Sequence, residues 1–146
     1  MVDDREANLI ALESVLQCFD AELIRADCGK AAIQQALQHE FALILLDVQM
    51  PQMDGYQCAS LLRALKLSQY TPIIFITAVN RGDAYVFKGY QSGAVDFLYK
   101  PYDPTILKSK VAVFLELYNQ KQALEESNCA QELLNQKLQD ANERLQ

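Results

Sequence analysis

Apolar and polar residues alternate along the chain in blocks that predict strands followed by helices. Two apolar runs, at 41–46 and 73–76, are bounded by turn-forming residues, as in strands buried on both faces of a sheet. Elsewhere apolar residues recur at spacings of three and four, which indicates helices with one buried face. The predicted strands span residues 21–26, 41–46, 73–76 and 95–99, and the predicted helices span residues 5–18, 30–38, 55–67 and 83–91. This alternation predicts an α/β fold, a parallel sheet with right-handed crossovers and helices on both faces.

The C-terminal part of the chain has a different pattern. No Gly or Pro follows Pro104, and the remaining residues predict one helix about 60 Å long at 1.5 Å per residue. One row recurs every seven residues and consists of Leu117, Leu124, Gln131, Leu138 and Leu145, while Lys121, Asn128, Asn135 and Asn142 lie between its members. The pattern predicts a coiled coil whose polar core residues fix its register, and it favours a parallel dimer over a solvated single helix.

Composition sets limits on function. With 146 residues, 51% of them hydrophobic, and a net charge of −6, the chain fits one globular domain without a surface for nucleic acid. No apolar run reaches membrane-spanning length and no signal peptide is evident, so we expect a cytoplasmic protein that is not bound to a membrane. The four cysteines are scattered and the lone His39 lies in a polar connection. We therefore expect free thiols and a surface imidazole rather than a zinc site or a catalytic triad.

Chemically active side chains follow the predicted strands directly. Asp47 ends the run at 41–46, Thr77 ends the run at 73–76 and Lys100 follows the last strand, while Asp3 and Asp4 form an acidic pair at the start. The carboxyl ends of parallel strands meet at one edge of a sheet, so we expect these groups around a single crevice. Taken alone, Asp47 fits equally well as the cap of the next helix.

A bound cation would offset the repulsion among these carboxylates. Three clustered carboxylates repel one another unless a positive ion lies among them, and hard oxygen ligands without histidine or thiolate suit Mg²⁺. Such an ion would draw a phosphoryl group to a carboxylate, Lys100 would add a second positive charge and Thr77 a hydroxyl. The constellation predicts an aspartyl-phosphate site at Asp47.

Four motifs carry a resemblance to a known family. They are the VDD start, LILLDVQMPQMDG around Asp47, PIIFITA and GAVDFLYKP. In order and spacing, the chain resembles the receiver domain of bacterial two-component response regulators over about residues 2–115. The resemblance implies a flavodoxin-like, doubly wound parallel sheet with strand order 2-1-3-4-5. It also implies a receiver domain at 1–115 and a coiled-coil linker at 116–146 that continues its last helix.

The resemblance also assigns roles to the residues of the acidic crevice. It implies that Asp47 is the phosphoacceptor and that Asp4 and Asp47 bind Mg²⁺ through their carboxylates. Asp3 would act on the ion through water, and the backbone carbonyl of Gln49 would complete the protein ligands. Lys100 would pair with the phosphoryl group.

A switch is implied at the neighbouring strand ends. On phosphorylation of Asp47, Thr77 would move toward the phosphoryl oxygens and Phe97 would move inward into the vacated space. Ala78 fits the small residue that the family carries there, because bulk would crowd the phosphoryl group. The peptide before Pro101 is expected to be cis.

The chain departs from the family pattern at its start. Only Met1 and Val2 precede the acidic pair, where a receiver has a longer apolar strand. Without that strand its two neighbours lack a ladder partner. A start at an internal Met, closure of the gap by a partner chain or by sliding strands, and a damaged receiver all account for this. We expect a sheet that still forms, with a loose corner at Asp3 and Asp4.

Two functions remain open from these residues. The first is a receiver phosphorylated by a cognate histidine kinase or phosphotransfer protein, which acts as a switch and relays its state through a dimeric helix to an output domain. The second is a non-phosphorylated pseudo-receiver that serves as a dimerisation and interaction module. A turnover phosphatase is disfavoured, because Gln49 stands where such enzymes place a second acid.

Overall fold

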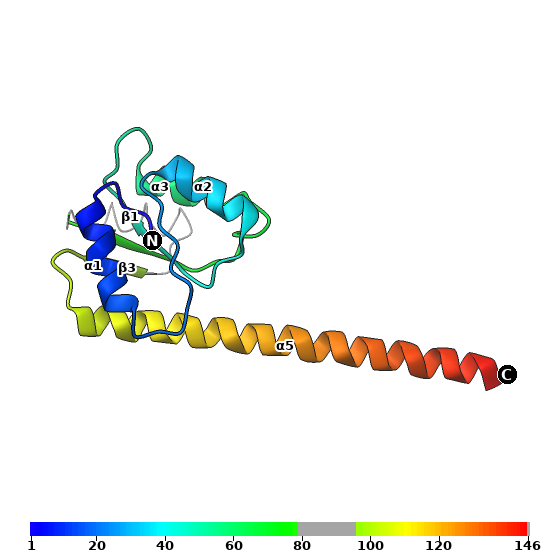
Figure 1. The fold of residues 1–146 in the computed structure, drawn as a ribbon. Helices are drawn as coiled ribbons and strands as arrows, with labels where there is room; N and C mark the ends of the chain where they lie inside the picture. The colour runs from blue at the N-terminus through cyan, green and yellow to red at the C-terminus, as the bar shows by residue number, and fades with distance from the viewer. Residues whose placement is uncertain (79–95, 146) are drawn as a thin grey trace. The chain divides into compact units, whose positions relative to one another are not determined.

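A computed structural model describes residues 1–78 and 96–145 of the chain. Its elements are α1 (Glu6–Leu16), α2 (Gly29–Gln38), β1 (Ile44–Asp47), α3 (Gly55–Arg63), β2 (Ile73–Thr77), β3 (Asp96–Tyr99) and α5 (Pro104–Leu145) (Figure 1). The predicted helix at 83–91 lies outside the described residues. The chain divides into two compact units, Met1–Phe114 and Leu115–Gln146. Among the described helices, none contains a stretch that is both long and apolar enough to span a membrane.

The sheet is parallel and follows the predicted strand order. β1 pairs with β2 and β2 pairs with β3, all in parallel register. Val2 forms parallel bridges to Ala26 on one side and to Leu46 of β1 on the other. Val2 therefore stands where the first strand of the order 2-1-3-4-5 belongs, and this short segment joins its two neighbours. The flavodoxin-like fold is confirmed.

The strand predicted at 21–26 is not formed and is reduced to the bridge at Ala26. Its partner is too short: the Met1 ammonium donates to the Ile24 carbonyl at 3.0 Å, Ala26 N–H donates to the Met1 carbonyl, and Asp3 N–H donates to the Ala26 carbonyl. A strand needs a continuous neighbour to satisfy its backbone groups, and two residues cannot provide one.

Other predicted boundaries shift for local reasons. β1 begins at Ile44 rather than at residue 41, opposite Ile73, because β2 itself starts only after Pro72, which has no N–H to donate. α3 ends at Arg63 rather than at residue 67. There the Ser68 hydroxyl donates to the carbonyl of Leu62 and ends the helical hydrogen bonding.

One face of the sheet packs against α2 and α3, which lie side by side (Figure 1). The buried side chains of this core are contributed by both strands and both helices: Ile44, Leu46, Ile73 and Phe75 from the strands, with Ala32, Ala36, Cys58, Ala59 and Leu62 from the helices. Small residues at the helix positions allow the two helices to approach the strands closely. Leu61 of α3 lies outside this core and is exposed.

The opposite face of the sheet is buried as well. Leu45 and Ile74 alternate with the residues of the first core and are equally inaccessible. Figure 1 places α1 and the first turns of α5 on this side. Their buried residues are Leu9, Leu12 and Leu16 of α1, with Leu107 and Val111 of α5. Because both faces are covered in the described part of the chain, polar groups gather beyond the ends of the strands rather than over the faces of the sheet.

The turn between β1 and α3 brings the helix start against the end of the strand. Gly55 N–H donates to the Val48 carbonyl at 2.8 Å, and a Cβ on Gly55 would lie 2.4 Å from the carbonyl oxygen of Asp47. Asp54 caps the helix, accepting from Gln57 N–H while the Gln57 side chain accepts from Asp54 N–H. The cap and the close approach fix the backbone that carries Asp47.

Gly55→Ala is expected to lower the free energy of unfolding by about 1–3 kcal/mol, because backbone rather than a flexible side chain blocks the added methyl group. Gly29→Ala is the matched control. Its Cβ would meet the Met53 side chain at 2.6 Å, which can turn aside, so a smaller loss is expected. Urea unfolding of both variants measures the difference; equal losses would contradict the argument.

Candidate functional site

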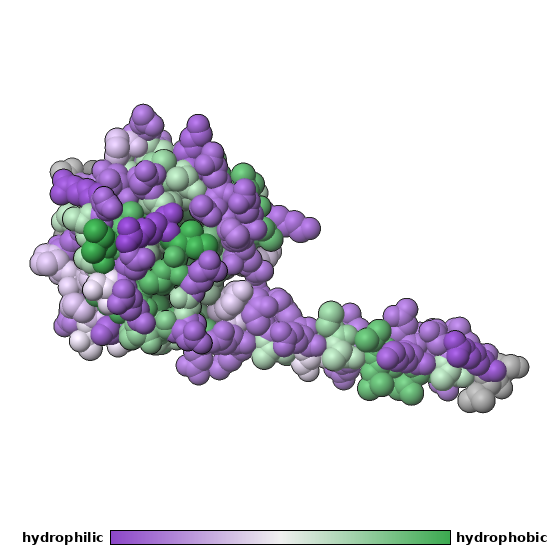
Figure 2. All heavy atoms as spheres, viewed as in Figure 1, coloured by the Kyte–Doolittle hydropathy of each residue, from purple (hydrophilic) through white to green (hydrophobic). Residues whose placement is uncertain are grey.

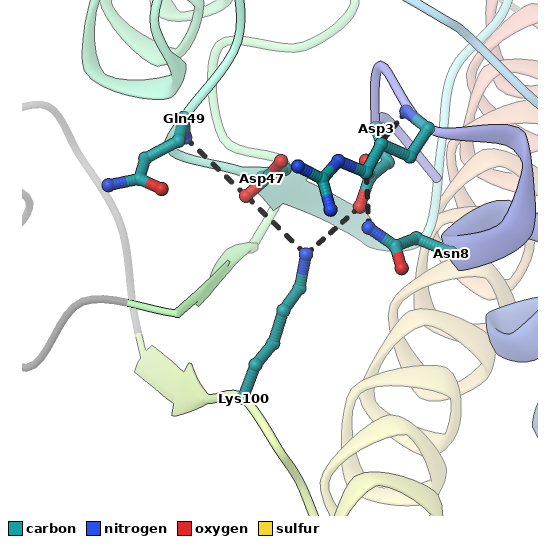
Figure 3. A network of polar contacts seen from close by, with 6 residues as sticks. Asp3, Asn8, Asp47, Gln49 and Lys100 are labelled. Atoms are coloured by element: carbon teal, nitrogen blue, oxygen red, sulfur yellow. Dashed lines mark hydrogen bonds and ion pairs between the residues drawn. The ribbon is translucent and has the colours of Figure 1, made fainter.

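Three charged side chains meet at the carboxyl end of the strands (Figure 3). Asp47 is the last residue of β1, Lys100 follows β3, and Asp3 follows the bridge residue Val2. The Lys100 Nζ lies 3.1 Å from Asp3 Oδ2 and 3.7 Å from Asp47 Oδ1. The ammonium therefore lies between two carboxylates from different strands, as the sequence predicts for this edge.

Asp3 is firmly held and does not form the loose corner that we expected. Its side chain is 2% exposed. Asp3 Oδ1 accepts from Arg5 N–H at 3.0 Å and from the Asn8 side chain at 3.3 Å, while Oδ2 accepts from Lys100. The bridge at Val2 places Asp3 and these bonds then fix it. Asn8, in the first turn of α1, was missed by the sequence argument; its place five residues after Asp3 is the only signal.

Asp4 completes a cluster of three carboxylates. Asp4 is exposed, whereas Asp3 and Asp47 are buried, and one oxygen from each of the three lies within 4.8 Å of the other two. Lys100 supplies one positive charge against these three negative ones. The cluster therefore keeps an excess of negative charge that can attract a cation.

Burial dominates the electrostatics of Asp47. It raises the pKa of this carboxyl from 3.8 to about 6, against the opposing effect of the Lys100 ammonium. Asp3 and Asp4 add to the rise by repulsion, and a hydrogen bond from Gln49 N–H at 3.4 Å opposes it. The ionised form of Asp47 is thus held at an energetic cost, which a bound cation would relieve.

Thr77 and Ala78 occupy the end of the adjacent strand. Thr77 is buried and closes β2, and its carbonyl accepts from Lys100 N–H at 2.7 Å. Ala78 follows and is exposed. The peptide between Lys100 and Pro101 is cis, as expected. Thr77 and Lys100 are therefore joined through their backbones next to Asp47.

Phe97 lies in β3 between the core and the surface. Its ring is half-buried, 5.3 Å from the ring of Phe75 and 6.4 Å from that of Tyr99, centroid to centroid. Asp96 accepts from Phe97 N–H at 2.8 Å and forms an ion pair with Lys110 of α5. This ion pair, which was not predicted from the sequence, ties the strand of Phe97 to α5 within the first unit.

The remaining sequence expectations concern residues away from this site. His39 is exposed, and all four cysteines are free thiols. Cys58 is fully buried between α3 and α2, and burial raises its pKa to about 12. At the site itself, the side chains of Asp3, Asp4, Asp47 and Lys100 lie close together.

The site can be compared with known proteins. The chain is 39% identical over 112 residues to the response regulator PleD of Caulobacter vibrioides and 36% identical over 115 residues to the transcriptional regulatory protein SrrA of Staphylococcus aureus. These matches cover 76% and 79% of this chain but only 24% and 46% of the relatives. The chain therefore spans less than half the length of either protein.

Solved structures of receiver domains have a similar fold. The fold is similar to the receiver domain of the sensor histidine kinase PA1611 from Pseudomonas aeruginosa, which was solved with a magnesium ion coordinated in its active-site cleft. That similarity has a TM-score of 0.71 and 26% sequence identity, and it covers 79% of this chain and 93% of the other. The sequence model of the family described as the response regulator receiver domain matches residues 1–112 of this chain. The chain thus belongs to the response regulator receiver domain family.

Proposed function

We propose that this receiver accepts a phosphoryl group on Asp47 in a reaction that depends on Mg²⁺. The observation that supports this most directly is the placement of Asp3, Asp4 and Asp47 around the Lys100 ammonium at the end of the sheet. Capping a helix does not account for Asp47, because Asp54 caps α3. The Asp47 carboxylate is instead buried beside the Lys100 ammonium.

The residues present fit a small divalent cation. Carboxylate oxygens are the ligands that Mg²⁺ prefers, and the three carboxylates are close enough to share one ion. Asp4 and Asp47 would bind it directly, Asp3 through water, and the Gln49 carbonyl would be a further ligand. The magnesium reported for the related PA1611 domain supports this assignment. When bound, the ion would neutralise charge on the phosphoryl oxygens.

The residues of the site divide the transfer between them. A carboxylate oxygen of Asp47 attacks the phosphorus, and the bond to the donor breaks with its electron pair leaving on the donor. Lys100 moves its charge from Asp3 and Asp47 toward the new phosphoryl group, and the Thr77 hydroxyl donates to one phosphoryl oxygen. As Thr77 moves toward the phosphoryl group, the Phe97 ring moves inward into the space that Thr77 vacates. The small side chain of Ala78 leaves room for the phosphoryl group. Because Asp47 is itself consumed and reset, this is a switch rather than a turnover enzyme.

The partners follow from this chemistry. The donor would be a histidine kinase or a phosphotransfer protein in the cytoplasm. Residues 116–146 would act as a coiled-coil linker that pairs with a second copy and relays the state of the receiver to an output domain. The ion pair between Asp96 and Lys110 offers one physical connection between the strand of Phe97 and α5.

Incubation with Mg²⁺ and acetyl phosphate is expected to add one phosphoryl group to the parent chain and none to Asp47→Asn. Intact mass spectrometry measures the gain. Asp27→Asn is the matched control, since Asp27 is exposed and lies outside the carboxylate cluster, and it should be phosphorylated like the parent. No gain in any of the three would instead assign the chain as a pseudo-receiver, a module for interaction alone.

Asp47→Asn is also expected to stabilise the metal-free protein near neutral pH. Because the pKa of Asp47 is raised in the folded state, ionisation of this carboxyl lowers the free energy of unfolding. The loss is absent below pH 3.8, the ordinary pKa, and is complete above about pH 6, the folded-state pKa. The difference corresponds to roughly 2–3 kcal/mol. Urea unfolding in a chelator should show the variant more stable by about that amount at about pH 7.5, with the gap closing toward about pH 4. A gap that does not change with pH would refute this account.

Mg²⁺ is expected to raise the unfolding midpoint of the parent at about pH 7.5 and to do so much less below about pH 6, where protons compete for Asp47. Thermal unfolding with and without excess Mg²⁺ measures the shift. The Asp47→Asn variant should respond weakly at both pH values, because one ligand has lost its charge. An equal response in parent and variant would place the ion elsewhere.

A further inference from the structure

The second compact unit, Leu115–Gln146, exposes apolar side chains along one helix. Figure 2 shows apolar patches between hydrophilic ones along this part of α5. Among the described side chains of the unit, the exposed leucines are Leu117, Leu124, Leu133, Leu134 and Leu138, each between 52% and 61% exposed. Leucines this exposed on a long helix indicate a face that another surface covers.

Two sets of residues can share a seam with the row Leu117, Leu124, Gln131 and Leu138. One lies four positions after each member of the row and consists of Lys121, Asn128, Asn135 and Asn142. The other lies three positions after each member and consists of Gln120, Ser127, Leu134 and Ala141. Only the second includes an exposed leucine, Leu134, and it places the charged Lys121 outside the seam. The second set therefore gives the more apolar face.

We propose that α5 pairs with a second copy of this chain, in parallel and in register, through a seam of Leu117, Gln120, Leu124, Ser127, Gln131, Leu134, Leu138 and Ala141. This inference rests on the proposed function, whose dimeric helix it specifies. The seam alternates steps of three and four residues over three full heptads, the period that two helices share in a left-handed coiled coil.

The charges on the helix complement this seam. Five of the six acidic residues of the unit fall at positions that face away from it: Glu125, Glu126, Glu132, Asp140 and Glu143. The sixth, Glu116, flanks the seam on one side, and Lys121 flanks it on the other. In a parallel pair, residues five apart on these two flanks oppose each other, so Glu116 of one copy faces Lys121 of the other. Charge therefore favours a second copy as the occupant.

The polar seam residues favour the parallel arrangement. In a parallel dimer each layer pairs a residue with itself, so Gln131 meets Gln131 and Leu138 meets Leu138. In the antiparallel alignment that pairs Leu124 with Leu134, Leu138 lies against Gln120. A parallel pair keeps apolar layers apolar and lets each polar layer form hydrogen bonds within itself, which also fixes the register.

Leu134 and Leu133 provide a matched test, because they are neighbours with 57% and 55% exposure. Analytical ultracentrifugation of the full chain is expected to show a dimer. Leu134→Lys should raise its dissociation constant on the order of 100-fold, because it buries two like charges in one layer. Leu133→Lys lies outside the seam and should change it by less than about threefold. A monomeric parent, or equal effects of the two variants, would overturn the proposal.

Cross-linking tests orientation without depending on a destabilised variant. In a chain with the exposed Cys18 and Cys129 replaced by serine, Ala141→Cys should form a disulfide between copies under mild oxidation. An antiparallel pair would separate these thiols by far more than the reach of a disulfide, so a dimer that does not cross-link overturns the parallel seam. Neither experiment involves phosphorylation: a monomer that is phosphorylated would refute the seam and the dimeric relay but leave phosphoryl acceptance by Asp47 standing, and an unphosphorylated dimer would refute phosphoryl acceptance alone.

Discussion

The pairing of Val2 with Ala26 and Leu46 is the constraint on which the acidic site depends. This one residue stands in the central position of the sheet. Its N–H donates to the Leu45 carbonyl and its carbonyl accepts from Asp47 N–H, both toward β1, while the neighbouring Met1 carbonyl and Asp3 N–H bond to Ala26 on the other side. The next residue is Asp3, so the same ladder that closes the sheet brings Asp3 beside Asp47. Loss of the ladder would separate two carboxylates that come from distant parts of the sequence.

Lys100 offsets only part of the repulsion that this arrangement creates. Its ammonium lies near both Asp3 and Asp47, but burial still leaves the pKa of Asp47 near 6. One cation is not enough for three carboxylates, so the site is ready to take a second one. The strain is local, since the apolar residues on both faces of the sheet are fully packed beneath it. A stable core thus supports an electrostatically unfavourable edge, as is common where a fold carries function.

Within the described residues, the two buried strands and the polar groups at their ends were predicted from the sequence, and so was the alternation of strands and helices apart from the strand at 21–26. The apolar runs leading into Asp47 and Thr77 have few alternatives to a buried strand, and the ends of parallel strands must share an edge. Prediction was wrong where a segment depended on its neighbour. Residues 21–26 have the composition of a strand but find only two residues to pair with, and α3 stops where Ser68 satisfies its last turn.

The available chemistry can be inferred from the sequence, because residue types and their positions after each strand are local facts. The way in which the charges are shared depends on tertiary contacts. Whether Asp3 is loose or fixed depends on Asn8, Lys100 and the bridge at Val2, which lie on three separate segments. The raised pKa of Asp47 likewise comes from burial, a property of the packed chain rather than of any stretch of it. Distances between distant segments are fixed only on folding, and electrostatic energies depend on those distances.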